Sequence, residues 1–304
     1  MSISRAEFKE LFDKSVLNIT TGIPIKNIIS EKLNSLTENK INPIFKTGLT
    51  DLDLAINTIE VGNLIVIAGR PSMGKTALLH TIIINSIPQN IPLAFFTFSD
   101  TIHYTTKKMM ASVSGLSYRE ISAPKTEKTV EHIKNCVQKL ADAPIFLEDF
   151  SKLTITDLKL RIHKLSHEGV KYIFIDNLQN IVYDTDDNLT EVQKQKNVVK
   201  ELKDLTKYLE VAIIITANLS RRVDIRGGDK RPILSDIRDY SSLEYFADII
   251  IFIYRAENYG LTEDENGYST KDKAELIIAK NRNGRQAVID VKFLPKLTYF
   301  KDIN

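Results

Sequence analysis

The sequence contains a single cysteine, Cys136, among its 304 residues. One cysteine excludes an intramolecular disulfide bond and any zinc site built from several thiolates. Cys136 lies within the helical pattern HIKNCVQKL, where we expect a small buried apolar residue rather than a nucleophile. A chain without disulfide bonds is typical of a reducing compartment, so the sequence predicts a cytoplasmic location.

Long apolar runs are also missing. Apolar runs such as Ile82–Ile84 and Ile249–Tyr254 are far shorter than the roughly 20 apolar residues that a membrane-spanning helix requires. Residues 1–30 carry scattered charged side chains and no apolar segment of the kind found in secretory signals. The sequence therefore predicts no membrane partner and no secretory signal.

Neither sign of charge is in excess, because 41 lysines and arginines are balanced by 39 acidic residues. The net charge of +2 neither favours nor excludes a nucleic-acid ligand, so any basic surface must be local. Apolar residues make up 43% of the chain and charged residues 26%, which are ordinary values for a globular protein. A chain of this length can bury one large core or two modest ones.

Residues 1–42 differ in pattern from the remainder and are predicted to form an N-terminal helical arm. Two segments, 6–19 and 25–40, carry apolar residues at helical spacing and are separated by TTGIP. The second segment places five apolar residues along one face: Ile25, Ile28, Ile29, Leu33 and Leu36. Short amphipathic helices without a core of their own need a partner surface, either on this chain or on a neighbouring one.

Residues 43–304 are predicted to form one α/β domain. Apolar strand segments alternate with helical ones and are Leu64–Ala68, Leu93–Phe98, Ile145–Leu147, Tyr172–Ile175, Val211–Thr216 and Ile249–Tyr254. This alternation predicts a mainly parallel central sheet flanked by helices on both faces. Near the end, residues 273–300 carry short β-type runs joined at Asn283-Gly284, which predict an antiparallel hairpin added to that sheet.

A glycine turn between the first strand and the next helix satisfies the pattern G-x-x-x-x-G-K-[ST]. Glycines let successive backbone N–H groups point at phosphate oxygens, and the helix N-terminus adds a partial positive charge. Lys75 can reach the β- and γ-phosphates, while the Thr76 hydroxyl can bind Mg²⁺. The sequence thus predicts an ATP site formed by Gly69, Arg70, Pro71, Ser72, Met73, Gly74, Lys75, Thr76 and Ala77.

Magnesium needs a second anchor, and Asp176 is the candidate. It ends the apolar segment KYIFID, where a carboxylate would emerge beside the phosphates. An aspartate at a strand end can also cap a helix, but its place after four β-type residues favours the metal role. Thr76 and Asp176 are therefore the predicted metal-binding pair.

Further motifs occur in a fixed order around this turn. TGLTDLD precedes it at 47–53, and FIDNLQ, DKRPILSDIRDYSSLEYFADIIIFIYR and AKNRNG follow it at 174–179, 229–255 and 279–284. In this order and spacing they resemble the ATPase core of DnaB-type replicative DNA helicases, within the RecA-like P-loop class. The resemblance covers residues 24–300, and the family's separate amino-terminal helical domain has no counterpart in this sequence.

The resemblance implies an assembly and its partners. Residues 25–40 match the linker helix that docks on an adjacent subunit. Lys280 and Arg282 match a basic pair that reaches into a neighbour's nucleotide site, with Arg282 as the arginine finger. A homo-hexameric ring acting on single-stranded DNA is the implied form, with a primase, initiator or loader as further partners.

Two departures from the family pattern bear on catalysis. Where the family has a glutamate that orients the attacking water, this sequence has Ser99, whose hydroxyl is a poor base near neutral pH. Asp100 follows and could substitute if the strand has ended or bulged there. Where the family has a γ-phosphate-sensing glutamine, this sequence has Asn218, although the second sensor position, Gln179, matches.

The predicted DNA contacts are mixed in charge. A glycine-containing loop carries a set of cations suited to phosphate-backbone contacts: Arg221, Arg222, Arg226, Lys230 and Arg231. The loop near 184–190 is instead acidic, with Asp184, Asp186 and Asp187, and would repel a DNA backbone. No motif indicates sequence-specific base recognition.

Two functions from different classes remain open. The first is a ring-forming, ATP-dependent DNA-translocating motor that hydrolyses ATP at subunit interfaces. The second is a catalytically weak or inactive ATP-binding subunit, which would stabilise an assembly with a helicase, initiator or primase. Lys75, Asp176, Lys280 and Arg282 favour the motor, whereas Ser99, Asn218 and the acidic loop favour the assembly subunit.

Overall fold

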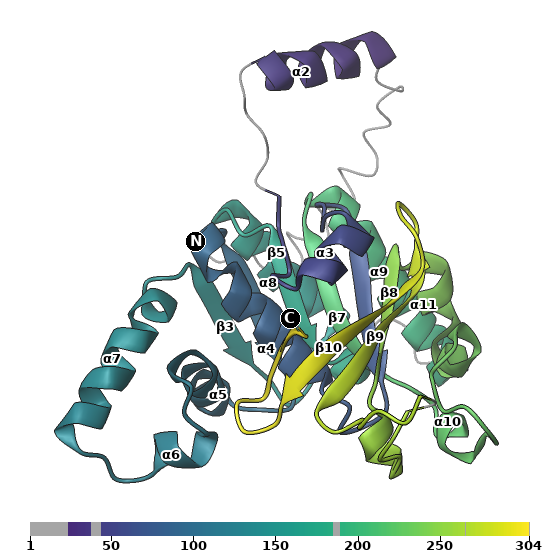
Figure 1. Cartoon of the computed structure of the whole chain (residues 1–304). Helices are drawn as coiled ribbons and strands as arrows, with labels where there is room; N and C mark the ends of the chain where they lie inside the picture. The colour runs from purple at the N-terminus through teal and green to yellow at the C-terminus, as the bar shows by residue number, and fades with distance from the viewer. Residues whose placement is uncertain (1–23, 38–43, 185–188, 265, 304) are drawn as a thin grey trace. The chain divides into compact units, whose positions relative to one another are not determined.

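A computed structural model describes residues 24–37, 44–184, 189–264 and 266–303 of the chain (Figure 1). Its contacts divide the chain into two units, residues 1–44 and 45–304, which are described separately below. In the first unit the described residues form one helix, α2 (Ile25–Thr37). This is the helix predicted from periodicity, and Ile25, Ile28 and Ile29 on it are exposed. The helix predicted over 6–19 lies outside the described residues.

The second unit is built on a nine-stranded sheet in the order β11-β10-β9-β8-β1-β7-β5-β2-β3, counted over the described residues. The strands, in chain order, are β1 (Leu64–Gly69), β2 (Leu93–Thr97), β3 (Ile145–Asp149), β5 (Tyr172–Asp176), β7 (Ala212–Asn218), β8 (Ile249–Tyr254), β9 (Lys273–Asn281), β10 (Ala287–Leu294) and β11 (Tyr299–Asp302). The neighbouring strands β8, β1, β7, β5, β2 and β3 all pair parallel to one another. The strands β9, β10 and β11 continue the sheet from β8 through antiparallel pairings.

The predicted mixed α/β fold with a C-terminal antiparallel hairpin is therefore confirmed. All six predicted apolar segments form strands, and β9 and β10 turn near Asn283 and Gly284. The pattern did not predict β11, which adds a third antiparallel strand. It also did not predict a short parallel pair, β4 (Leu153–Thr154) with β6 (Ile181–Val182), outside the main sheet.

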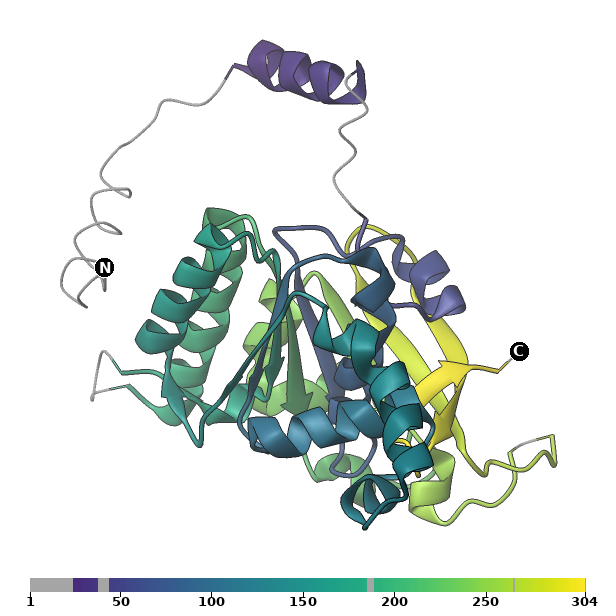
Figure 2. The ribbon, with the colours of Figure 1, turned by 90° about the vertical axis from the view of Figure 1, so that its left-hand side faces the viewer.

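Helices cover both faces of the sheet (Figure 2). The α-helices are α3 (Thr50–Ile56), α4 (Lys75–Ser86), α5 (Ile102–Ser114), α6 (Tyr118–Ser122), α7 (Glu127–Ala141), α8 (Ile155–His167), α9 (Glu191–Tyr208), α10 (Arg222–Ile225) and α11 (Ser241–Phe246). Short 3₁₀ helices are η1 (Ile87–Gln89), η2 (Leu178–Asn180), η3 (Leu234–Tyr240) and η4 (Ala256–Tyr259).

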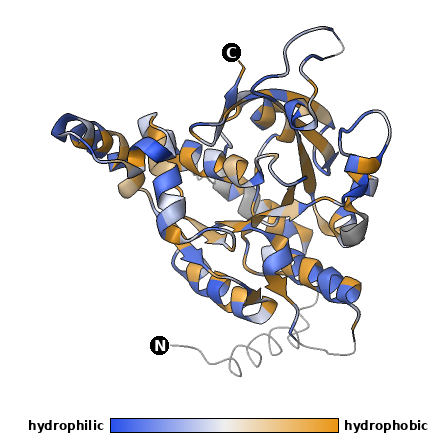
Figure 3. Cartoon of the chain, turned by 90° about the horizontal axis from the view of Figure 1, so that it is seen from below, coloured by the Kyte–Doolittle hydropathy of each residue, from blue (hydrophilic) through white to orange (hydrophobic). Residues whose placement is uncertain are grey.

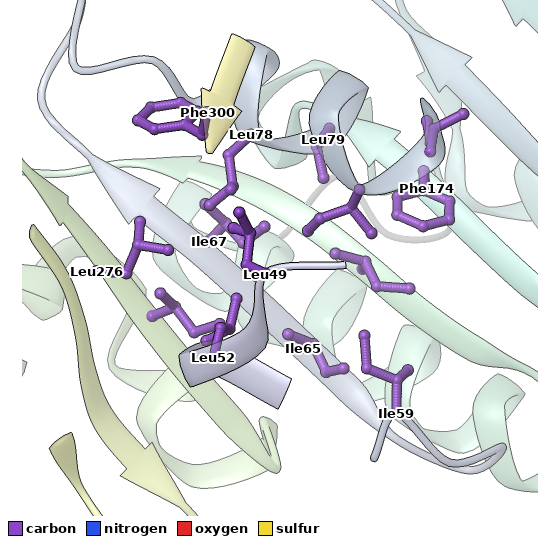
Figure 4. Close-up of a cluster of buried hydrophobic side chains, with 14 of the residues drawn as sticks. Leu49, Leu52, Ile59, Ile65, Ile67, Leu78, Leu79, Phe174, Leu276 and Phe300 are labelled. Atoms are coloured by element: carbon purple, nitrogen blue, oxygen red, sulfur yellow. The ribbon is translucent and has the colours of Figure 1, made fainter. Parts of the chain in front are cut away.

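Alternate residues of β1 enter two separate cores, as strand geometry requires. Ile65 and Ile67 pack with α3, α4 and the antiparallel strands on one face (Figure 4). Leu64, Val66 and Ala68 pack with α8, α9 and α11 on the other. Because both faces are covered, β1 is apolar throughout and the other central strands are mostly apolar, which Figure 3 shows as hydrophobic strands inside mixed helices.

Cys136 corrects one expectation. It lies on α7 and is half-buried rather than buried, with Sγ near the ring of His132 one turn earlier. On the described part of α7, only Ile133 is buried, because this helix packs on α5 rather than on the sheet. An amphipathic pattern predicts which face of a helix is apolar, but not how much of that face other elements of the fold will cover.

None of the helices within the described ranges is long and apolar enough to cross a membrane.

The buried histidine of α4 makes stability depend on pH. His80 is 1% exposed and contacts the Phe95 ring edge-on, and burial lowers its pKa to about 3, with the charge of Lys108 contributing. Because the unfolded chain binds a proton near pH 6.5 and the folded chain does not, stability falls as the pH drops below that value. Between about pH 7.5 and pH 5 this histidine should remove about 2 kcal/mol of unfolding free energy.

Urea unfolding of His80→Met at both pH values tests this. The variant should lose less stability on acidification than the wild type, by about that amount. His103→Met, which replaces an exposed histidine on α5, is the matched control. An equal loss in the wild type and in His80→Met would contradict the prediction.

Candidate nucleotide-binding site

The glycine turn lies between the buried strand β1 and helix α4, at the carboxyl end of β1. Ser72 and Gly74 both have positive φ, 66° and 104°, which curl the turn back over the start of α4. A Cβ on Gly74 would lie 2.8 Å from Cζ of Phe300 in β11, so this position needs glycine for both its conformation and its space. The turn therefore has the shape that its sequence pattern predicts.

Lys75 is folded back into this turn. Its Nζ donates to the carbonyl oxygens of Gly69, at 2.9 Å, and of Arg70, at 3.1 Å. Burial lowers the pKa of Lys75 to about 8; the carboxylate of Asp176 opposes this effect and the nearby Arg70 guanidinium adds to it. A half-buried ammonium whose hydrogen bonds within the described residues go to carbonyl oxygens is a favourable partner for an incoming anion.

The two residues predicted to bind metal lie in direct contact. Asp176 ends β5 and is 2% exposed, and its Oδ2 accepts a hydrogen bond of 2.5 Å from the Thr76 hydroxyl. Its Oδ1 accepts a hydrogen bond from the buried hydroxyl of Thr216 on β7. A carboxylate beside a hydroxyl at the phosphate turn is an oxygen donor set of the kind that Mg²⁺ prefers.

Sequence reasoning missed Thr216. The signal was available, since a hydroxyl interrupts the otherwise apolar run AIIITA, all of whose residues are buried. Its partner could not be inferred from the pattern, because β5 and β7 become neighbours only in the folded sheet.

Ser99 and Asp100 lie beyond the end of β2, which stops at Thr97. The backbone N–H of Phe98 donates to the carbonyl oxygen of Asp176, so this segment runs beside the metal-binding pair. Ser99 is exposed, and Asp100 Oδ2 pairs with Lys108 Nζ of α5 at 2.8 Å. The strand has thus ended before Asp100, and this was the condition under which the Asp100 side chain could turn towards the site. The Asp100 carboxylate is, however, paired with Lys108.

The two predicted sensor residues flank the same edge. Asn218 ends β7 and pairs in register with Gly69, the first residue of the turn. Gln179 lies on η2, shortly after Asp176, and both polar atoms of its amide are buried without a hydrogen-bond partner among the described residues. Such an amide is costly unless a water molecule, a ligand or another chain engages it.

Lys280 and Arg282 lie at the opposite end of the parallel strands from the glycine turn, beside the amino ends of β8 and β1. β9 runs antiparallel to β8, so it ends beside Ile249 and Ile250, where β8 and β1 begin. The separation from this chain's own turn is at least the length of β1, roughly 17 Å. Lys280 Nζ donates to the carbonyl oxygens of Glu244 and Ala247, and Arg282 Nη1 lies 3.2 Å from Oδ1 of Asp248.

The five predicted DNA-binding cations differ in their surroundings. Arg226 pairs with Asp236 and Arg231 with Glu275, at 3.0 Å and 2.7 Å, while Lys230 Nζ donates to the carbonyl oxygen of Asp224. The remaining two, Arg221 and Arg222, are exposed. In the acidic loop, Asp184 accepts a hydrogen bond from Thr156, while Asp186 and Asp187 lie outside the described residues.

A mainly parallel sheet with a phosphate-type turn after β1 and an aspartate ending β5 defines the RecA-like class of P-loop folds. Within it, the chain belongs to the DnaB-like helicase C terminal domain family, whose model matches residues 45–302.

Curated relatives agree with this assignment. A probable replicative DNA helicase of Trieres chinensis is 30% identical over 99% of this chain and 68% of its own length. The replicative DNA helicase DnaB of Geobacillus stearothermophilus is 31% identical over 84% of this chain and 56% of its own. The replicative DNA helicase DnaB of Helicobacter pylori strain J99 is 26% identical over 92% of this chain and 65% of its own length. The chain therefore spans slightly more than half to about two thirds of these relatives.

Solved structures show the same fold. A solved ATPase domain matches with a TM-score of 0.80 at 24% identity, over 91% of this chain and 99% of that one. A DnaB-like replicative helicase, solved in a study of its interactions with primase, matches with a TM-score of 0.79 at 22% identity. The match covers 98% of this chain and 71% of the helicase chain.

The Thr216–Asp176 contact yields a stability prediction. Thr216→Val keeps the shape of the side chain but removes a hydrogen bond to a buried carboxylate, so it should lower the unfolding free energy by about 1.5–3 kcal/mol. Thr216→Ser keeps the hydroxyl and is the matched control. Urea unfolding measures both variants, and a Thr216→Val protein as stable as the wild type would show that the hydroxyl contributes nothing beyond its volume.

Proposed function

We propose that this chain is the motor domain of a DnaB-type replicative helicase, which binds ATP with Mg²⁺ and uses its hydrolysis to move along single-stranded DNA. The observation that carries the proposal is the cluster of Lys75, Thr76 and Asp176 at the carboxyl edge of a sheet of this family. The relatives are named replicative helicases, which favours the motor over a non-hydrolysing assembly subunit.

The nucleotide would lie along the turn from Gly69 to Ala77. Backbone N–H groups of the turn and of the start of α4 would hold the phosphates, and Lys75 would exchange its two carbonyl partners for phosphate oxygens. Thr76 and Asp176 would hold Mg²⁺, which neutralises phosphate charge when bound. Gln179 and Asn218, at the same edge, would sense the terminal phosphate.

Hydrolysis needs a group that orients water, and Asp100 is our candidate. Its carboxylate is paired with Lys108, so it would become available as the base when that pair opens. Ser99 can hydrogen-bond water but cannot take its proton at neutral pH.

A neighbouring subunit would complete the site. Lys280 and Arg282 lie too far from their own glycine turn to reach it, which supports their action on the nucleotide of the next subunit. The exposed apolar face of α2 supports docking of the arm, residues 1–42, on a neighbour of the domain 43–304.

A homo-hexameric ring would satisfy both requirements. DNA would be contacted by the basic loop, through Arg221, Arg222, Arg226, Lys230 and Arg231. Further partners in the cytoplasm would be an initiator, a loader or a primase, the last of these being the protein with which the similar DnaB-like helicase interacts.

Steady-state ATP hydrolysis with and without single-stranded DNA tests the motor. The wild type should show DNA-stimulated turnover. Lys75→Ala, which removes the ammonium group that would contact the phosphates, should abolish it. Asp100→Asn should lower turnover about 100-fold or more if this carboxylate is the base. Ser99→Glu, which restores the family's glutamate, should rescue the Asp100→Asn variant.

Two outcomes would contradict these assignments. Wild-type turnover at the level of Lys75→Ala, despite measurable ATP binding, would overturn the motor and leave an assembly role. Full activity in Asp100→Asn would overturn Asp100 as the base while leaving the motor intact.

ATP affinity should also depend on the charge of Lys75. The pKa of about 8 in the free protein means that this lysine is largely neutral at about pH 9, whereas phosphate binding favours the protonated form. Affinity should therefore fall about tenfold between about pH 7 and pH 9. Fluorescent ATP titration measures this, and Lys75→Arg, which keeps its charge throughout, should show a flat profile. A tenfold fall in Lys75→Arg would assign the dependence to another group.

A further inference from the structure

The side chain of Arg70, the second residue of the glycine turn, leaves the turn and binds Asp224 of α10. Its Nε lies 2.9 Å from Oδ2 of Asp224 and its Nη2 lies 2.6 Å from the same oxygen, with Nε also 3.1 Å from Oδ1. Its Nη1 donates to the carbonyl oxygen of Leu219 at 2.9 Å. The Arg70 side chain is 15% exposed and that of Asp224 is 39% exposed, so Arg70 is largely shielded from water while its partner lies at the surface.

Asp224 lies within the basic loop, residues 221–231, that carries the five predicted DNA-binding cations. Its backbone carbonyl accepts a hydrogen bond of 2.9 Å from Lys230 Nζ, and its Oδ1 accepts one of 3.2 Å from the Tyr259 hydroxyl of η4. A neighbour of Tyr259, Asn258, donates to the carbonyl oxygen of Ser72 in the glycine turn at 3.1 Å. Asp224 thus joins three segments that are distant in sequence.

The contact is of a strong and directional kind. A guanidinium that donates through two nitrogens to one carboxylate fixes both the distance and the orientation of its partners. The hydrogen bond from Arg70 is the largest cause of the lowered pKa of Asp224. Arg70 is also close enough to Lys75 for its charge to lower the pKa of that lysine, so a bound phosphate would act on both cations.

We propose that Asp224 is a positioning residue that couples nucleotide occupancy of the glycine turn to the placement of the basic loop 221–231, acting through Arg70. The proposal rests on the function proposed above and names the contact by which nucleotide and DNA would influence each other. A triphosphate in the turn competes with Asp224 for the Arg70 guanidinium, and weakening that pair releases the segment that carries Arg222, Arg226 and Lys230. Because such coupling is reciprocal, DNA that moves the loop must change ATP affinity by the same factor.

Two variants isolate the contact. Asp224→Asn removes the charge that holds Arg70, while Asp229→Asn makes the same change in the same loop, where Asp229 contacts Arg231 and not the glycine turn. Both variants make the loop more basic and should bind DNA somewhat more tightly for that reason alone. A difference between them therefore reports the contact rather than the charge.

The first readout needs no DNA. Hydrogen exchange of the backbone amides in 221–231 is measured on the full chain with and without ATPγS and Mg²⁺. Exchange in this loop should change on nucleotide binding in the wild type and in Asp229→Asn, and should stay unchanged in Asp224→Asn. A wild type that binds ATPγS with no change in this loop, or an unaltered response in Asp224→Asn, would overturn the proposal.

The second readout is the coupling factor itself. The affinity for an oligothymidine is measured with and without ATPγS, and that for ATPγS with and without the oligothymidine. Both ratios should be equal and at least about fivefold in the wild type and in Asp229→Asn, and below about twofold in Asp224→Asn. Equal ratios in all three proteins would overturn the role of Asp224. A third outcome is possible, in which the wild-type affinity ratios equal one while nucleotide still changes hydrogen exchange in the wild type and not in Asp224→Asn. That outcome would overturn DNA as the coupled ligand but leave the role of the Arg70–Asp224 contact in place.

Discussion

The carboxylate of Asp176 is the constraint on which the nucleotide-binding edge depends. It is buried, so it must be hydrogen-bonded on both oxygens or the fold bears the cost of an unsatisfied charge. Thr76 of α4 and Thr216 of β7 satisfy it, and its backbone carbonyl accepts from Phe98 after β2. Four elements therefore have to be in register at one point. The same contacts that stabilise the charge fix Lys75 and the glycine turn beside it.

A second buried carboxylate organises the opposite edge. Asp248, just before β8, accepts from Lys203 of α9 at 2.5 Å and from the backbone N–H of Leu64 at 2.8 Å, and its other oxygen lies near Arg282. Because β9 runs antiparallel to β8, the chain returns to this edge before it reaches Lys280 and Arg282. The proposed need for a neighbouring subunit thus follows from strand direction, since one chain has its glycine turn and its basic pair at opposite ends of the sheet.

Charge in the basic loop is largely balanced within the chain. Arg226, Arg231 and Lys230 each contact acidic side chains or carbonyl oxygens of the same domain, which lowers the attraction that they can exert on a phosphate backbone. Arg221 and Arg222 are exposed and form no ion pair among the described residues, so the DNA contacts proposed for them would not first require such a pair to break. The near-neutral net charge of the whole chain is consistent with this local arrangement.

The sequence by itself determined the class of fold, the order of most strands along the chain and the identity of the phosphate turn. These are local properties: apolar runs of strand length, a glycine turn at a strand–helix junction and an aspartate after a buried strand are each complete within about ten residues. The family resemblance added Lys280, Arg282 and the departures at Ser99 and Asn218.

The tertiary structure alone decided which of these residues meet. Thr216 joined the site because β7 lies between β1 and β5 in the sheet, an order that the linear sequence does not contain. The Asp100–Lys108 and Arg70–Asp224 pairs likewise depend on which helix packs beside which loop. Burial, and with it the pKa of Lys75 and His80, is set by the packing of all these elements together, because desolvation is a property of the surroundings and not of the residue.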